Sequence, residues 1–194
     1  MSKMKTMLKS EKRNSASRYY ITKADKMFNV INSGLNRISK EAKRNLAYSL
    51  RYLEFLQLQL DELVLDDMMI KMIHKNFIIT SLAIIELIMQ DSTNANVYGE
   101  KLLIEFRNKN LFNLKDEDFE KLDKFRKLRN RVHLQLRFED DQTDWFAFEK
   151  CDYLDMKKLL YQILTSEKMF NKPYRTYIDF LKQERTHYAK RTIT

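Results

Sequence analysis

The stretch FIITSLAIIELIM, residues 77–89, decides the fold class of this chain. It is apolar on nearly every side of a helix, and Glu86 is its only charged residue. Because it is shorter than the roughly 20 residues that cross a bilayer, it predicts a buried core helix rather than a membrane span. The helix that contains it should run from about Asp67 to Gln90 and lie at the centre of a bundle.

The composition of the remaining chain also favours helices. With two Gly and one Pro in 194 residues, the chain has almost no material for β-hairpin turns or for a glycine-rich phosphate loop. The single cysteine, Cys151, excludes an intramolecular disulfide and a multi-cysteine zinc site, and fits a reducing, cytoplasmic setting. We therefore expect one all-α domain over residues 18–194, an up-and-down bundle of about five to seven helices, without a cofactor.

Positive charge is concentrated at the N-terminus. The formal net charge is +9, and residues 1–23 hold seven Lys or Arg and one acid. Residues 1–17 are polar, Lys-rich and without periodicity, which predicts a disordered basic tail with no secretory signal. Such a tail attracts polyanions by counterion release, but it is equally consistent with a tail that only aids solubility.

Periodicity and breakers place the other elements. Helices are expected at Tyr19–Asn32, Leu35–Leu65, Tyr98–Asn108, from a cap at Asn113 or Asp116 to about Arg137, Tyr153–Phe170 and Tyr174–Lys190, with a loop at 91–96 and a short extended piece at 145–148. The second helix carries an apolar stripe, which consists of Leu46, Leu50, Leu53, Gln57, Leu60 and Val64. Gln57 either sets the register of a helix pair or lies at the rim of the packing face.

The helix that ends near Arg137 has a core face and a polar edge. Its core face comprises Leu122, Phe125, Leu128, Val132 and Leu136. At about 100° per residue, a polar stripe lies beside that face and consists of Arg126, Arg129, Asn130, His133 and Arg137. Neighbours three and four residues apart on a helix can converge on one ligand, so this stripe is the candidate site.

The stretch FRKLRNRVHLQ, residues 125–135, resembles the motif of the HEPN family of helical-bundle domains. In that motif an Arg, often followed by Asn or another polar residue, is separated from a His by four to six residues. The resemblance covers about residues 35–190. It implies a metal-independent endoribonuclease of toxin–antitoxin or phage-defence systems, whose two motif helices meet across a homodimer.

The sequence differs from the family motif in its spacing. Arg129, which Asn130 follows, has only three residues between it and His133, whereas Arg126 has six. The arginine followed by Asn and the correctly spaced arginine are therefore different residues. The sequence leaves open which of them binds phosphate.

The residue types suit RNA cleavage by 2′-OH attack. His133 would act as the base or as the acid, since an unperturbed His titrates near pH 6.5. Arg126 and Arg129 would stabilise charge on the phosphate, and Asn130 would orient the phosphate or the imidazole. Arg131 and Arg137 are assigned to RNA binding. The alternative is a basic helix edge with a surface His.

Glu86 is the candidate supporting residue. An acid within a core helix is costly unless it is paired, so it either holds a motif arginine from the neighbouring helix or points out of the bundle.

Other candidates are weaker. His74 is expected to be a partly buried structural residue and His187 to be solvated, and neither has a zinc-ligand spacing, so we expect no metal. Cys151 has no evident catalytic partner, and the Arg107-Asn108 pair has no His within reach. The competing hypothesis for function is a non-catalytic helical module that binds nucleic acid or a protein partner. Within the resemblance, an antitoxin or a nucleotidyltransferase is a possible partner, and no membrane is expected.

Overall fold

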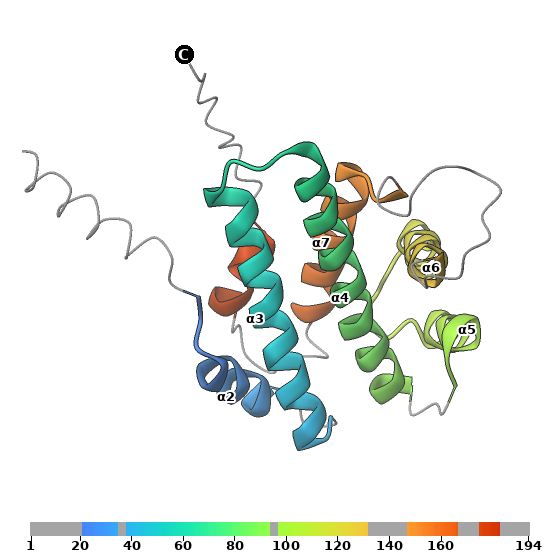
Figure 1. Cartoon of the computed structure of the whole chain (residues 1–194). Coiled ribbons are helices and arrows are strands. Elements are labelled where there is room, and N and C mark those ends of the chain that lie inside the picture. The colour runs from blue at the N-terminus through green and yellow to red at the C-terminus, as the bar shows by residue number, and fades with distance from the viewer. Residues whose placement is uncertain (1–20, 35–37, 94–96, 132–146, 167–174, 183–194) are drawn as a thin grey trace, which may run out of the picture.

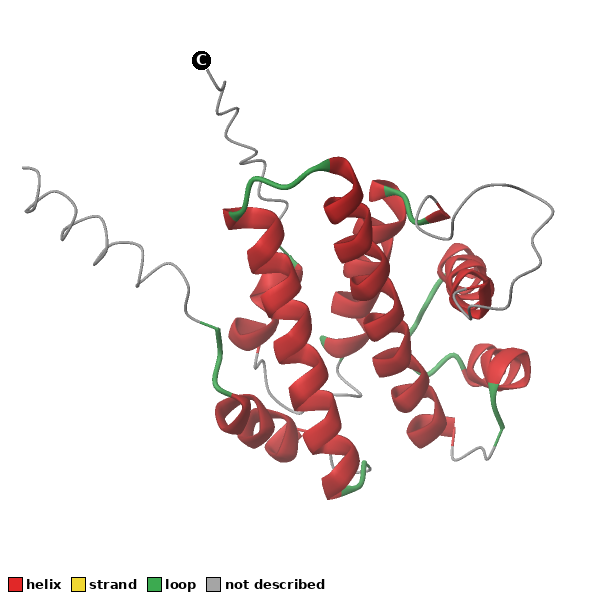
Figure 2. Ribbon diagram, viewed as in Figure 1, coloured by secondary structure: helices red, strands yellow, loops and turns green. Residues whose placement is uncertain are grey.

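A computed structural model describes residues 21–34, 38–93, 97–131, 147–166 and 175–182 of the chain. Within these ranges it has six α-helices, one 3-10 helix and no strand, which confirms the predicted all-α bundle (Figure 2). The predicted basic tail, residues 1–17, lies outside the described residues.

Most helices lie close to where the sequence predicted them. The elements are α2 (Ala24–Gly34), α3 (Lys40–Glu62), α4 (Asp67–Thr93), α5 (Gly99–Lys109), α6 (Asp116–Arg131), α7 (Lys150–Leu164) and η2 (Arg175–Leu181). The Ser39 hydroxyl caps α3 by accepting a hydrogen bond from the Ala42 N–H at 3.2 Å. The Asp66 carboxylate does the same for the start of α4, where it accepts from the Met69 N–H at 2.7 Å.

Four predictions about local structure were wrong. Residues 91–93 continue α4 because the Thr93 and Ser92 hydroxyls donate to the Met89 carbonyl at 2.7 and 3.2 Å. Neither Asn113 nor Asp116 caps α6, because the Lys115 N–H donates to the Asp118 carboxylate at 3.0 Å and the helix begins at Asp116.

The other two errors concern the C-terminal third of the chain. The described part of the expected extended piece is not a strand: Ala147 lies in a helical turn, and Phe148 is buried against the bundle. The last predicted helix is a 3-10 helix over its described length, Arg175–Leu181.

Helix α4 is the centre of the bundle, as its sequence predicted. It packs against α3, α5, α6 and α7, and Figure 1 shows α3 and α4 in front of α7 and η2, with α5 and α6 beside α4. Phe77, Ile78 and Ile85 on α4 are fully buried. An 18-residue window of α4 has a mean hydropathy of 1.5, which is apolar enough for a membrane span, but 61% of that window is buried inside the bundle, as in a core helix.

The apolar stripe of α3 was predicted well apart from its end. Leu46, Leu50 and Leu53 are buried, but Val64 lies beyond the helix and is 81% exposed. Gln57 is buried, so the rim position considered for it was wrong.

Gln57 instead joins α3 to α7. Its Oε1 accepts hydrogen bonds from the Tyr153 hydroxyl and, at 2.7 Å, from Lys157 Nζ, while its Nε2 donates to Asp61 at 2.9 Å. A buried polar group with several partners fixes one relative position of two helices, because any shift would leave the group unsatisfied.

His74 lies in the same buried layer. It is 3% exposed, more deeply buried than the sequence suggested, and its ring stacks on Tyr153 with 4.5 Å between centroids. The pKa of His74 is lowered to about 4, chiefly by burial and also by nearby Lys150, while Glu149 opposes the shift. The neutral imidazole is therefore the native form.

We predict that His74 makes the fold sensitive to acid. Because its folded pKa is below the ordinary value of 6.5, the stabilising effect is complete above pH 6.5 and is lost as the pH falls toward 4. Between pH 7.5 and 5 this residue should lower the free energy of unfolding by about 2 kcal/mol. Urea unfolding of the unsubstituted chain and of His74→Phe, which keeps the stacked ring but cannot titrate, measures the difference. If the free energy of unfolding falls equally for the two proteins between pH 7.5 and 5, His74 is not the cause of the acid sensitivity.

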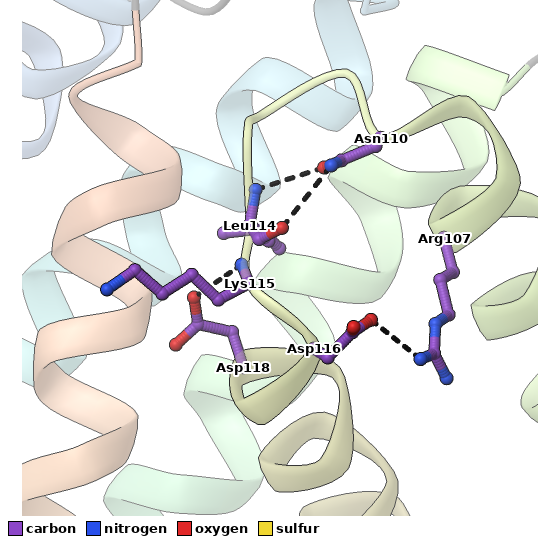
Figure 3. A network of polar contacts seen from close by, with 6 residues as sticks. All are labelled: Arg107, Asn110, Leu114, Lys115, Asp116 and Asp118. Atoms are coloured by element: carbon purple, nitrogen blue, oxygen red, sulfur yellow. Dashed lines mark hydrogen bonds and ion pairs between the residues drawn. The ribbon is translucent and has the colours of Figure 1, made fainter.

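The turn between α5 and α6 sets the position of α6 and is built around Asn110 (Figure 3). Asn110 has a left-handed backbone with φ of 32°. Its side-chain Oδ1 accepts a hydrogen bond from the Leu114 N–H at 3.0 Å, and its Nδ2 donates to the Leu114 carbonyl at 3.3 Å. Arg107 then pairs with Asp116 at 2.6 Å, across the turn.

Substitution of Asn110 should therefore destabilise the fold in two separable ways. Asn110→Ala loses both side-chain hydrogen bonds and strains the backbone, which should cost about 2–3 kcal/mol by urea unfolding. Asn110→Gly relieves the backbone strain and should cost about 1 kcal/mol less than Ala. Asn108→Ala, an exposed neighbour on α5, serves as the control. If Asn110→Ala and Asn108→Ala lower the free energy of unfolding by the same amount, Asn110 does not hold the turn.

Candidate functional site

Helix α6 presents its apolar side to the bundle and is tied to α7 by charge. Phe119, Leu122 and Phe125 are buried, as the sequence predicted for the latter two. Lys121 Nζ lies 2.8 Å from the Asp155 carboxylate, and one turn later Lys124 pairs with buried Asp152. These hydrogen-bonded carboxylates raise the pKa of both lysines. The helix is therefore held on both its apolar and its polar flank.

The predicted polar edge is present on α6 over the residues that are described. The Arg126 side chain is 16% exposed and the Arg129 side chain 29%, while Asn130 is exposed. Both arginines thus lie at the border between core and solvent. Their guanidinium groups are partly desolvated, which strengthens their interaction with any anion that reaches them.

Arg126 belongs to a cluster of three charges on one helix. Its Nε and Nη2 donate to the same Asp123 carboxylate oxygen at 3.0 and 2.6 Å, and Lys127 Nζ binds the other oxygen at 2.7 Å. The hydrogen bond from Lys127 is the largest cause that lowers the pKa of Asp123, and Arg126 adds to it. Two cations share one anion, so the cluster keeps a net charge of one positive unit.

Arg129 has a different partner. Its Nη1 donates to the Glu86 carboxylate on α4, and both side chains are mostly buried. The contact that the sequence suggested between Glu86 and a motif arginine is therefore present, with Arg129 as the partner. The pair is neutral overall and links the central helix to the motif helix.

Part of the predicted site lies outside the described residues. His133 and Arg137 follow the last described residue of α6, and the side chain of Arg131 is likewise not described. The same holds for the predicted core residues Val132 and Leu136 and for the predicted end of the helix near Arg137. The catalytic and RNA-binding roles of the whole set stay predictions.

Asp123 was missed in the sequence analysis. Its signal was present, because an acid three and four residues before Arg126 and Lys127 places three charges on one side of a helix.

The weaker candidates occupy ordinary positions. Cys151 is exposed near the start of α7, and Arg107 is an exposed residue that pairs with Asp116 and lies 5.7 Å from the ring centre of Phe119. Over the ranges that the structure describes, no three His, Cys, Asp or Glu side chains gather as metal ligands would.

Comparison of the chain with protein-family models, with curated proteins and with solved structures finds no match.

We predict that the Glu86–Arg129 pair contributes more to stability than an exposed ion pair does. A double-mutant cycle with Glu86→Gln and Arg129→Gln should give a coupling of about 1–2 kcal/mol, since the charges are mostly buried and hydrogen-bonded. The same cycle on exposed Arg107 and Asp116 is the control and should give at most about 0.5 kcal/mol. A coupling for the buried pair no larger than the control would show that Glu86 does not hold Arg129.

Proposed function

We propose that this chain is a metal-independent endoribonuclease that cleaves RNA by attack of a 2′-OH. The observation that supports it most is the edge of α6, where Arg126 and Arg129 lie one helical turn apart at the core boundary, each paired with a carboxylate. A guanidinium group held at a fixed position suits a phosphate that gains charge in the transition state. In the sequence, Asn130 and His133 follow directly.

The proposed reaction needs a base, an acid and charge stabilisation. The 2′ oxygen attacks phosphorus and loses its proton to a base, the bond from phosphorus to the 5′ oxygen breaks, and that oxygen takes up a proton. The products are a 2′,3′-cyclic phosphate and a 5′-hydroxyl. His133 is assigned to one of the two proton transfers, since an imidazole is half protonated near neutral pH. Asn130 orients the phosphate or the imidazole.

We assign phosphate binding to Arg126 and a positioning role to Arg129. Two observations support this choice: Arg126 has the family spacing to His133, and its cluster with Asp123 and Lys127 keeps a net positive charge. Arg129 is neutralised by Glu86. Because a guanidinium has five N–H donors, Arg126 can bind Asp123 and still donate to a phosphate. Arg131 and Arg137 are proposed to bind the flanking RNA.

The biological setting is proposed from the resemblance alone. It favours a cytoplasmic toxin or phage-defence effector, silenced by an antitoxin or a nucleotidyltransferase, that acts on single-stranded or loop RNA.

Cleavage of a single-stranded RNA in EDTA tests the proposal. His133→Ala should lower the rate by about 10²–10⁴-fold, as loss of a general acid or base does. Arg126→Ala should lower it about 10²–10³-fold through loss of charge stabilisation. Arg107→Ala, which removes an exposed arginine that is also followed by Asn, is the control and should stay within about twofold because its ion pair is exposed.

Two outcomes would overturn the proposal. One is cleavage of RNA by His133→Ala at the same rate as by the unsubstituted chain, or cleavage of DNA, which lacks the 2′-OH, at the same rate as of RNA. The other is RNA binding without cleavage that disappears when residues 1–17 are removed and is unchanged in His133→Ala, which would establish the non-catalytic binding module instead.

A further inference from the structure

Aromatic rings and arginines lie together on the outer side of α3. We name these side chains the aromatic–arginine track, which consists of Arg44, Tyr48, Arg51, Tyr52 and Phe55. At about 100° per residue, all five lie within about 100° of the circumference of the helix, so they form one surface. The rings are well exposed, since 59% of Tyr48 and 41% of both Tyr52 and Phe55 is accessible.

No described helix covers this side of α3. The helix packs against α2, α4 and η2, and in Figure 1 it stands in front of η2 with α2 and α4 on either side of it. Its buried side, which includes Leu46, Leu50 and Leu53, faces the bundle. The aromatic–arginine track lies on the opposite side and faces solvent.

The two arginines of the track have no carboxylate partner. The structure describes the side chains of five arginines, and three of them, Arg107, Arg126 and Arg129, pair with an acid. Within the described ranges, no acid forms an ion pair with Arg44 or Arg51. Their positive charges are therefore available to an external anion.

The surroundings of the two arginines keep them available. Glu54 lies three residues after Arg51, but its carboxylate oxygens accept hydrogen bonds from the Thr22 N–H at 3.0 Å and the Thr22 hydroxyl at 3.1 Å. Burial raises the pKa of Glu54, the Thr22 hydrogen bonds oppose the rise, and Arg51 is the weakest of the opposing causes. The Arg44 guanidinium lies 5.6 Å from the ring centre of Phe28 on α2, a cation–π contact that leaves N–H groups able to bind a phosphate.

The charge around the track is positive. Between its two ends, Asn45 is the only other exposed residue, so no exposed acid interrupts it. Acids lie beyond its ends: Glu41 follows Lys40 in the first turn of α3, and half-buried Glu62 lies about 10 Å past the last ring at 1.5 Å per residue. On α2, which packs beside α3, residues 23–26 add two exposed lysines and one exposed aspartate. The centre of the track therefore keeps the positive charge of its two arginines.

From these observations we infer that the aromatic–arginine track binds single-stranded nucleic acid, with bases stacked on its rings and phosphates bound by its arginines. Exposed aromatic side chains next to cations bind single strands without sequence preference, because every base has a flat face. A double helix offers phosphates but keeps its bases stacked inside, so it cannot use the rings. From Arg44 to Phe55 the track is about 17 Å long at 1.5 Å per residue, which accommodates about five nucleotides at 3.4 Å each.

The inference goes beyond the proposed cleavage and does not require it. The track lies on α3, whereas Arg126 and Arg129 lie on α6, and stacking does not use the 2′-OH. Binding can therefore be measured with strands that 2′-OH attack cannot cut. The failure of one proposal is then distinguishable from the failure of the other.

Fluorescence anisotropy of the full chain with labelled probes of eight nucleotides tests the track. The probes are single-stranded DNA, the same sequence as 2′-O-methyl RNA, and the DNA as a duplex, in about 0.15 M salt to limit binding through phosphates alone. The unsubstituted chain should bind the single strands at least about fivefold more tightly than the duplex, because each stacked base contributes about that factor or more. The tighter of the two single strands shows whether RNA or DNA is preferred.

Two variants separate stacking from charge. Tyr48→Ala with Tyr52→Ala should weaken single-strand binding by about 30-fold and leave duplex binding within about twofold. Arg51→Gln should weaken single-strand binding and lower the slope of its salt dependence by about 0.7, as loss of one phosphate contact does. All three positions are exposed, so the variants should keep the helical circular dichroism spectrum.

The matched controls are Tyr52→Phe, which keeps the ring, and Tyr98→Ala, which removes an exposed tyrosine outside the track. Both should bind within about twofold of the unsubstituted chain. The inference is overturned if the folded Tyr48→Ala/Tyr52→Ala chain binds single strands as tightly as the unsubstituted chain, if Tyr98→Ala weakens binding equally, or if the duplex binds as tightly as the single strands. An eight-residue glutamate peptide that binds while neither single strand does would assign the track to an acidic protein instead.

Discussion

Burial of most of the apolar surface of α4 is the constraint on which the rest of the structure depends. A helix with so little polar surface is stable in water only when other helices cover it, and α3, α5, α6 and α7 do so. The same burial creates a requirement at Glu86, because a carboxylate at the core boundary is costly without a cation. Arg129 meets that requirement from α6. The packing of the core and the position of the candidate site are therefore coupled through one ion pair.

A second polar arrangement makes the packing specific. Apolar side chains alone would tolerate a small shift of α7 relative to α3, because the hydrophobic effect has no direction. Gln57, Tyr153 and Lys157 remove that freedom, since a shift would separate buried donors from their acceptor. His74 fits the same layer only as a neutral ring stacked on Tyr153. These contacts give the bundle one arrangement, and they also bury His74, whose protonation in acid destabilises the fold.

Charge is divided between distinct surfaces of the molecule. Cations gather along α6, where carboxylates hold the arginines at fixed positions and leave a net positive charge around Arg126. The outer side of α3 instead combines the aromatic side chains of Tyr48, Tyr52 and Phe55 with exposed Arg44 and Arg51.

The sequence alone determined the helical class, the central place of α4 and the apolar side of α6, because these follow from composition and from the 3.6-residue period. It also indicated that Glu86 either pairs with an arginine of the neighbouring helix or points out of the bundle, because an acid surrounded by Ile and Leu has no local partner. Only the tertiary structure decided that the cation is Arg129 and that Gln57 is buried rather than at a rim. The exposed face of Tyr48, Tyr52 and Phe55 likewise emerged only from packing. One helix has several apolar stripes, and which of them is covered depends on the neighbours that the fold brings to it.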